Sequence, residues 1–289
     1  MSKRKVIALM YRSRRNHVTL QKAMPPTAML AVIFLLFSAS QHVNAQTNSE
    51  QGRDVLAQSF SKYLHLSSYA GKSSADMIVT DTNGHILSQV GSSVEFKFKR
   101  PNKVRFDFST PLGSRIVWCD STTVGVFDPL SRKYWLCPAA PDMDTMLGVL
   151  DKTAQISTFM DPLYGICRAG IPGQLLGIRL RDKTTFNGHP AYVISATTKL
   201  PTPAEWSWWI DVNTMLILKV EQVQRNIQQN RSVMDHGKVV TSTQTLNLLT
   251  RDVISDARPN AQIQDSEFAY KPPTGATVRN TQITAGGNR

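Results

Sequence analysis

The sequence is poor in the residues and motifs on which most enzymes and metalloproteins depend. It has three cysteines and six histidines; two of these histidines fall within the first 45 residues and the other four lie far apart. It contains no Gly-x-Ser-x-Gly elbow, no His-Glu-x-x-His pair and no glycine-rich phosphate loop. We therefore expect a protein that is not an enzyme and that holds no metal and no cofactor. A catalytic triad assembled from distant residues is the alternative.

The first 45 residues lack acidic side chains and lack an apolar run long enough for a permanent membrane span. They carry seven cations, then an apolar run over residues 28–37, then the small-x-small sequence Val43-Asn44-Ala45. This is the order of a secretory signal peptide, so residues 1–45 are expected to be cleaved and the protein to be exported. An uncleaved anchor is the alternative. No cysteine follows the cleavage site, which excludes lipid attachment there.

More than half of the net positive charge of the chain lies in that signal peptide. The net charge is +12 for 289 residues, and removing seven cations and no acid leaves +5 for the remainder. This remainder is long enough to bury a substantial core. An exported, mildly basic protein without the glycine-bearing aromatic motif of RNA-binding sheets is not expected to bind nucleic acid.

The three cysteines, Cys119, Cys137 and Cys167, would meet an oxidising compartment, where one disulfide and one free thiol are the default expectation. Cys119 and Cys137 fall on the first and third strands of a predicted meander, and both neighbour Val124 on the middle strand. Two strand spacings separate them by about 9.6 Å, beyond the limit of about 7 Å for a bridge. These two are therefore not expected to pair, and Cys137 with Cys167 is the candidate disulfide.

The hydrophobic pattern predicts one helix followed by many short strands. The helix is expected over residues 50–66, where apolar residues recur at helical spacing. Short runs separated by turn residues then indicate an antiparallel meander rather than βαβ units. The expected strands cover residues 74–80, 85–90, 93–99, 103–108, 115–119, 124–128, 133–137, 177–181, 191–198, 206–211, 216–223 and 239–249. The fold class is therefore α+β, with one long curved antiparallel sheet.

A helical insertion interrupts the strands between residues 141 and 176. Its first helix is expected to be capped by Asp142 or Asp144. Four apolar residues at helical spacing form its buried face: Met143, Met146, Leu147 and Leu150. Residues 224–237 are polar and are expected to form a loose hairpin tip. Residues 279–289 have nothing to bury and are expected to be disordered, which leaves residues 46–278 as the folded domain.

One basic stretch, residues 96–108, is also unusually aromatic. In two extended strands its even-numbered apolar residues share one face and its odd-numbered charged residues share the other. The apolar set is Phe96, Phe98, Val104, Phe106 and Phe108. Arg100 has the parity of the apolar set and adjoins the turn between the strands. The apolar face is either ordinary core or, in an exported protein rich in Phe, Trp and Met, the wall of a deformable pocket for an apolar ligand.

Four short motifs follow one another along the chain in the order in which they occur in one known family. They are Leu-Ser-Ser-Tyr at 66–69 before Asp-Thr-Asn-Gly at 81–84, Phe-Lys-Arg-Pro-Asn at 98–102, the segment 117–129, and the ending Phe-Ala-Tyr-Lys-Pro-Pro-Thr-Gly at 268–275. In these motifs the sequence resembles the LolA-like superfamily, the periplasmic outer-membrane lipoprotein carriers and their relatives. Trp118 and Cys119 depart from the family's small polar residue, and Gly125 departs from its usual aromatic residue.

The resemblance implies an unclosed β-barrel, a LolA-like half-barrel, whose concave apolar side is covered by helices. It implies that a cavity for acyl chains is lined by Phe96, Phe98, Val104, Phe106 and Phe108. Arg100 would lie at the rim and bond to backbone groups of a lid, which is formed by Met143, Met146, Leu147 and Leu150. The implied function is that of a soluble periplasmic carrier or binder of acylated ligands, lipoprotein or lipid, with inner- and outer-membrane envelope proteins as further partners. An envelope-stress sensor or interaction module that signals to a membrane partner is the alternative.

Overall fold

A computed structural model describes residues 48–111, 113–143, 145–146, 175–198, 203–235 and 238–278, with the backbone alone for 231–235 and 238–240. Contacts divide the chain into Met1–Asn48 and Ser49–Arg289, and the fold below is that of the second unit. The expected signal peptide and the expected tail both lie outside the described residues, as do Leu147, Leu150 and Cys167. Within the described part of the chain, no helix is both long and apolar enough to cross a membrane.

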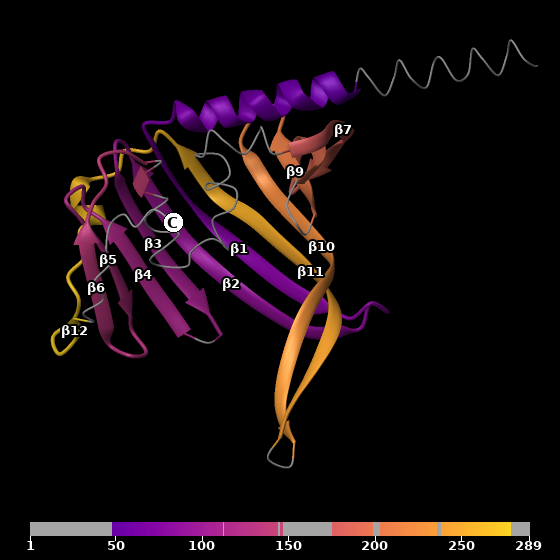
Figure 1. The fold of residues 1–289 in the computed structure, drawn as a ribbon. Coiled ribbons are helices and arrows are strands. Elements are labelled where there is room, and N and C mark those ends of the chain that lie inside the picture. Colours follow the sequence, from indigo (N-terminus) through magenta and orange to yellow (C-terminus); the bar gives the residue numbers. More distant parts are fainter. Residues whose placement is uncertain are drawn as a thin grey trace, which may run out of the picture. The chain divides into compact units, whose positions relative to one another are not determined.

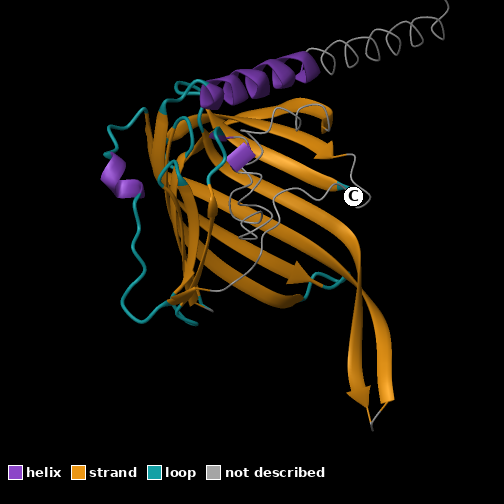
Figure 2. Cartoon of the chain, turned by 60° about the vertical axis from the view of Figure 1, so that its left-hand side comes forward, coloured by secondary structure: helices purple, strands orange, loops and turns teal. Residues whose placement is uncertain are grey.

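The described strands form one sheet of twelve, in the order β12-β6-β5-β4-β3-β2-β1-β11-β10-β9-β8-β7. All neighbours are antiparallel except β12 and β6. The strands are β1 Ser68–Thr80, β2 Ile86–Lys99, β3 Lys103–Thr110, β4 Gly113–Cys119, β5 Thr123–Asp128, β6 Lys133–Pro138, β7 Leu175–Phe186, β8 His189–Thr198, β9 Ala204–Asp211, β10 Ile217–Asp235, β11 Lys238–Pro259 and β12 Thr277–Val278. The sheet is strongly curved and does not close, since β12 and β7 are its two ends (Figure 2). The predicted half-barrel is confirmed.

The N-terminal helix covers residues 48–64, within two residues of the range predicted from its apolar spacing, and lies across one end of the strands (Figure 1). Gly52 brings the helix against β7, where a Cβ atom would meet the backbone of Arg179 and Leu180. The Ser49 hydroxyl donates to the Ile178 carbonyl at 3.1 Å. At the other end, the Ile217 amide donates to the Tyr63 hydroxyl at 3.0 Å. The helix therefore spans from β7 to β10 and holds the curve of the sheet.

Several strands, among them β1, β7 and β11, are longer than predicted, and two segments predicted as turns are strand. Residues 85–90 and 93–99 belong to one strand, β2, because Gly91 pairs in register with Asp76 of β1 instead of forming a turn. The predicted loose tip at 224–237 is strand up to residue 235, within a long β10–β11 hairpin that projects beyond the sheet (Figure 1). Polar side chains support that hairpin by pairing across it, as where Thr243 donates to Asn230 at 2.9 Å. Cross-strand hydrogen bonds thus extend β2 and β10 through residues that, taken locally, favour turns.

Candidate ligand-binding face

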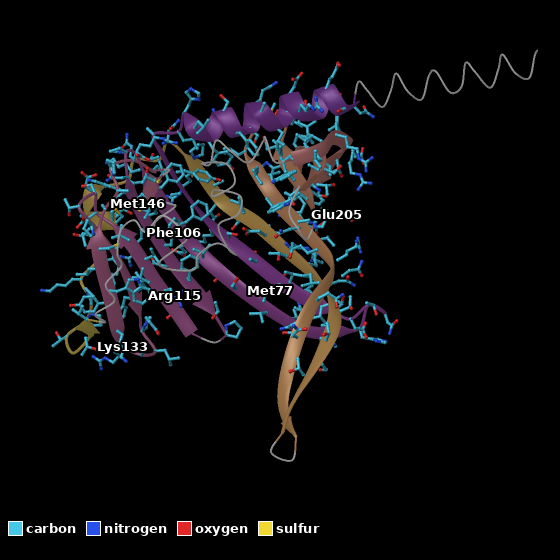
Figure 3. The ribbon with its side chains drawn as sticks, viewed as in Figure 1. Met77, Phe106, Arg115, Lys133, Met146 and Glu205 are labelled. Carbon is cyan, nitrogen blue, oxygen red and sulfur yellow. The ribbon has the colours of Figure 1, made fainter. Side chains whose placement is uncertain are left out.

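The five apolar residues of the stretch 96–108 lie on one face of the β2–β3 hairpin, as their parity predicted. Register pairs Phe96 with Phe106 and Phe98 with Val104, while Phe108 is opposite Val94. All five are buried, Phe106 to 1% exposure, and they belong to the main apolar cluster. We call Phe96, Phe98, Val104, Phe106 and Phe108 the apolar wall. Figure 3 labels Phe106, which belongs to β3.

The same cluster continues across the sheet on both sides of the apolar wall. Its members include Val117 and Val126 towards β6, and Ile194, Trp208 and Val220 towards β7, all buried. Side chains of the N-terminal helix and of the segment after β6 close over it. One continuous apolar surface therefore follows the concave side of the curved sheet.

Tyr69 lies at the centre of this surface and was not among the predicted site residues. Its ring packs edge-on against Tyr63 of the helix at 5.4 Å, and against Phe96 and Phe98 at 5.3 and 5.8 Å between centroids. Burial raises the pKa of Tyr69 to about 12, so its hydroxyl stays neutral. The sequence analysis missed it because β1 begins at residue 68, six residues before the predicted start, and this start places Tyr69 opposite Phe98.

Arg100 leaves the apolar wall at the turn and binds backbone carbonyl groups. Its Nε donates to the Leu66 carbonyl at 2.9 Å and its Nη2 to the Tyr63 carbonyl at 3.4 Å. Both carbonyls are at the C-terminal end of the N-terminal helix, where unpaired acceptors and the helix dipole favour a cation. Arg100 thus makes backbone hydrogen bonds of the expected kind, but to this helix rather than to the segment around Met143.

Met143 and Met146 lie against the cluster, at 1% and 0% exposure. Asp142 caps their turn as predicted, since its carboxylate accepts hydrogen bonds from the Thr145 amide at 2.8 Å and the Thr145 hydroxyl at 3.0 Å. Buried Asn102 tethers the preceding residues by donating to the Ala140 carbonyl at 2.7 Å. We call Met143 and Met146 the lid turn; Figure 2 shows this turn inside the curve of the sheet.

A cavity of about 480 Å³ opens where the rim and the lid turn meet. It is lined by Arg100, Pro101, Asp142 and Met143. The structure thus brings together the predicted rim residue and one of the four predicted lid residues. Met146 is buried beside them, and Leu147 and Leu150 lie outside the described residues. A ligand role for the apolar wall, the rim and the lid stays a prediction.

The opposite face of the same hairpin carries the odd-numbered charged residues, as predicted, and another part of the chain covers it. A short 3₁₀ helix, η3 (Asp265–Phe268), crosses it and supplies acids from the C-terminal part of the chain. Lys99 and Lys103 contact Asp265 at 2.8 and 2.7 Å, and Lys97 contacts Glu267 at 2.6 Å. Lys103 and Lys99 lower the pKa of Asp265 to about 2. The lysines of the basic stretch are therefore paired with acids of the same chain.

The two departures from the family pattern compensate each other on this face. Trp118 and Gly125 are paired across β4 and β5, and the indole occupies the space that a Cβ atom at Gly125 would need. Tyr270 packs over Trp118 at 4.8 Å between ring centroids, and the Arg105 guanidinium lies 4.7 Å from the Tyr270 ring. This aromatic stack holds the C-terminal segment against the convex side.

The cysteines follow the predicted meander. Register places Cys119 and Cys137 on either side of Val124, and the two thiols are not bridged to each other, as expected. Burial raises the pKa of Cys119 to about 11 and also raises that of Cys137. The Cys137–Cys167 bridge stays a prediction, because Cys167 lies outside the described residues. Among the described residues, no three His, Cys, Asp or Glu side chains gather as metal ligands.

The family described as "Predicted periplasmic protein (DUF2092)" matches residues 54–279. The chain belongs to this family. The match covers the N-terminal helix from its second turn and every strand of the sheet. No curated protein matches this DUF2092 chain.

Solved structures with a similar course of the chain share little sequence with this DUF2092 protein. A LolA superfamily protein from Nitrosomonas europaea is 10% identical, with a TM-score of 0.30 over 76% of this chain and 97% of the other. The Mycobacterium tuberculosis lipoprotein LppX is 9% identical, with a TM-score of 0.37 over 74% and 98%. A chain of the Pseudomonas aeruginosa MucA/MucB complex is 15% identical, with a TM-score of 0.37 over 76% of this chain and 61% of the other. These values are too low to transfer a ligand or a partner.

Proposed function

We propose that this protein is a soluble, non-catalytic periplasmic carrier or binder of acylated ligands, lipoprotein or lipid. In this proposal the acyl chain enters beside Arg100 and Met143 and lies along the apolar wall. The acylated molecule is then the substance carried, and envelope proteins of the inner and outer membranes are the partners that deliver and receive it.

The observation that carries the proposal is the position of the rim cavity. It opens at the end of the continuous apolar surface, and its volume of about 480 Å³ lies within the usual range for small-molecule sites, roughly 300–1,000 Å³. Met143 lines it with a flexible, unbranched side chain that adapts to an inserted chain. Burial of each methylene in such a site contributes about 0.8 kcal/mol, so ten methylenes supply roughly 8 kcal/mol before the costs of binding.

Arg100 fits this entry in two ways. Its guanidinium ties the rim to the end of the N-terminal helix, so the cavity mouth keeps its shape. Pro101 adds a rigid, apolar surface beside it. In the proposal, the polar end of the acylated molecule stays at this mouth while the acyl chain passes inward.

The test combines native mass spectrometry with thermal melts. Protein purified from its own periplasm is expected to carry acyl-containing adducts, and delipidated protein is expected to melt at a higher temperature when a palmitoylated peptide is added, because the peptide binds the folded state. Met143→Lys is expected to lose this rise, since it places a charge at the entrance. Thr145→Lys, an exposed neighbour on the same turn, is expected to keep it.

Wild-type protein that carries no acyl adduct and shows no shift with the peptide would overturn the proposal and make the apolar wall ordinary core. A co-purifying protein without lipid would replace the carrier with a protein-interaction or envelope-stress sensing role.

A further inference from the structure

A second cavity lies away from the apolar wall, on the strands at the β7 end of the sheet. Its volume is about 520 Å³. Three arginines border it, two from β7 and one from β10: Arg179, Arg181 and Arg225. Among its described lining residues, Glu205 of β9, labelled in Figure 3, is the single carboxylate. The cavity is therefore cationic.

Register builds the floor of this cavity from hydroxyl groups. Arg179 pairs with Ser195, and Ser195 pairs with Ser207, so the three form one row across β7, β8 and β9. This row lies on the face opposite the buried cluster, because the next residues along β8 and β9, Ile194 and Trp208, point into that cluster. Arg179 Nε donates to the Ser195 hydroxyl at 3.3 Å, which orients the guanidinium over the row.

The arginines are only partly neutralised. Arg225 Nε contacts Glu205 at 3.3 Å, but both side chains are 59% exposed, so this pair is weak and open to exchange. Glu221, the next residue after Ser207 across the sheet, already contacts Lys219 and Arg251 at 2.8 and 2.9 Å.

Within the described part of the chain, no acidic side chain pairs with Arg179 or Arg181, and both are exposed. Their guanidinium groups keep donors directed to solvent.

The side chains that border the cavity therefore offer mainly hydrogen-bond donors. Guanidinium groups donate only, and the serine hydroxyls can donate to a ligand as well as accept.

We propose that this cavity, bordered by Arg179, Arg181 and Arg225, binds the phosphate group of a small molecule. Guanidinium forks match phosphate oxygens in pairs, and serine hydroxyls complete the donor set. The ligand source is either free phosphate or the headgroup of a phospholipid, which share this chemistry. The site is separate from the apolar wall and does not depend on acyl binding there.

The experiment titrates the full chain, without its signal, by calorimetry at low ionic strength. Inorganic phosphate is one probe, and dihexanoyl phosphatidylglycerol below its micelle concentration is the other. Both are expected to bind and to compete. Tighter binding of the lipid assigns the site to a headgroup, and equal or tighter binding of phosphate assigns it to the free ion. Absence of heat with both probes overturns the proposal.

Some variants are expected to weaken phosphate binding and one is expected to strengthen it. Arg179→Gln/Arg181→Gln is expected to weaken binding at least about tenfold, since charge-assisted hydrogen bonds are lost. Glu205→Gln is expected to tighten binding, because it frees Arg225 and removes a competing acceptor. The matched controls Arg53→Gln/Lys62→Gln and Glu95→Gln remove the same charges from exposed positions elsewhere and are expected to change nothing.

Thermal melts of every variant establish that each is folded. Equal effects of the site variants and their controls would show a non-specific charge effect and overturn the proposal. Met143→Lys leaves this site intact, so loss of acyl binding and loss of phosphate binding are distinguishable.

Discussion

The two faces of the β2–β3 hairpin have the same length and the same strands, yet they are covered by different parts of the chain. The concave face presents the apolar wall to the N-terminal helix and the lid turn. The convex face presents lysines to the acids of η3, about 160 residues later in the sequence. One face is held by burial and the other by exposed ion pairs, so the two respond differently to substitution, pH and salt.

The contacts of the two faces show which side of the basic stretch is available to a ligand. Its cations do not form a free surface, because Asp265 and Glu267 engage Lys97, Lys99 and Lys103. Its aromatic residues face the cover on the concave side. The function proposed above therefore concerns the apolar face, and the charged face anchors the C-terminal segment.

The largest effect is expected for Phe106→Ala on the apolar face. Phe106 is 1% exposed, and its ring packs 6.0 Å from that of Phe108. Removing the ring is expected to lower the free energy of unfolding by about 3 kcal/mol, because in this structure it is packed within the main apolar cluster. Urea denaturation measures this change.

Ser109→Ala, an exposed position on the same strand, is the control and is expected to change stability by less than about 0.5 kcal/mol. A loss of only about 1 kcal/mol for Phe106→Ala would show that the space in front of the ring is open without ligand, so the two faces would differ less than their burial suggests.

A smaller effect is expected for Arg100→Ala, at the turn that joins the two faces. The variant loses both hydrogen bonds to the Tyr63 and Leu66 carbonyls, which is expected to cost about 2 kcal/mol in urea denaturation. Hydrogen exchange is expected to speed up first at the C-terminal end of the N-terminal helix. Arg100→Lys keeps the charge but not the planar fork and is expected to recover only part of the loss. Unchanged exchange in this helix would contradict the assigned role.

The smallest effect concerns the convex face and is a dependence on pH. The folded-state pKa of Asp265 is lowered from 3.8 to about 2 by Lys103 and Lys99. A carboxyl with a depressed folded pKa contributes stability above its unfolded pKa and loses it as pH falls through the folded pKa. The urea midpoints of wild type and Asp265→Asn are therefore expected to differ above pH 4 and to converge as the pH approaches 2.

The salt dependence of stability is a second test of the same ion pairs. Added salt is expected to reduce the difference between wild type and Asp265→Asn, because the carboxylate is exposed and its interactions are screened. Asp54→Asn, for which the described structure shows no ion pair, is the control and is expected to follow wild type. A difference that persists at pH 2 would show that Asp265 acts through packing rather than charge.

The sequence predicted much of the fold and part of the candidate site. The helix, the meander and the face assignment of the apolar wall all follow from local periodicity, because a strand alternates its side chains whatever lies around it. The separation of Cys119 and Cys137 by one strand follows from the same geometry. The Asp142 cap follows from local hydrogen bonding between near neighbours.

Local patterns in the sequence predicted which segments contain strands, which face a strand residue takes and where the N-terminal helix lies. Only the tertiary structure decided what each face meets: the helix end that binds Arg100, the acids that neutralise Lys99, and the arginines gathered from β7 and β10. It also decided how far strands continue, as through Gly91, because a paired neighbour supplies hydrogen bonds that override a local turn preference. The physical reason is the same in each case: periodicity is a property of the local backbone, whereas partners come from distant segments that no local pattern selects.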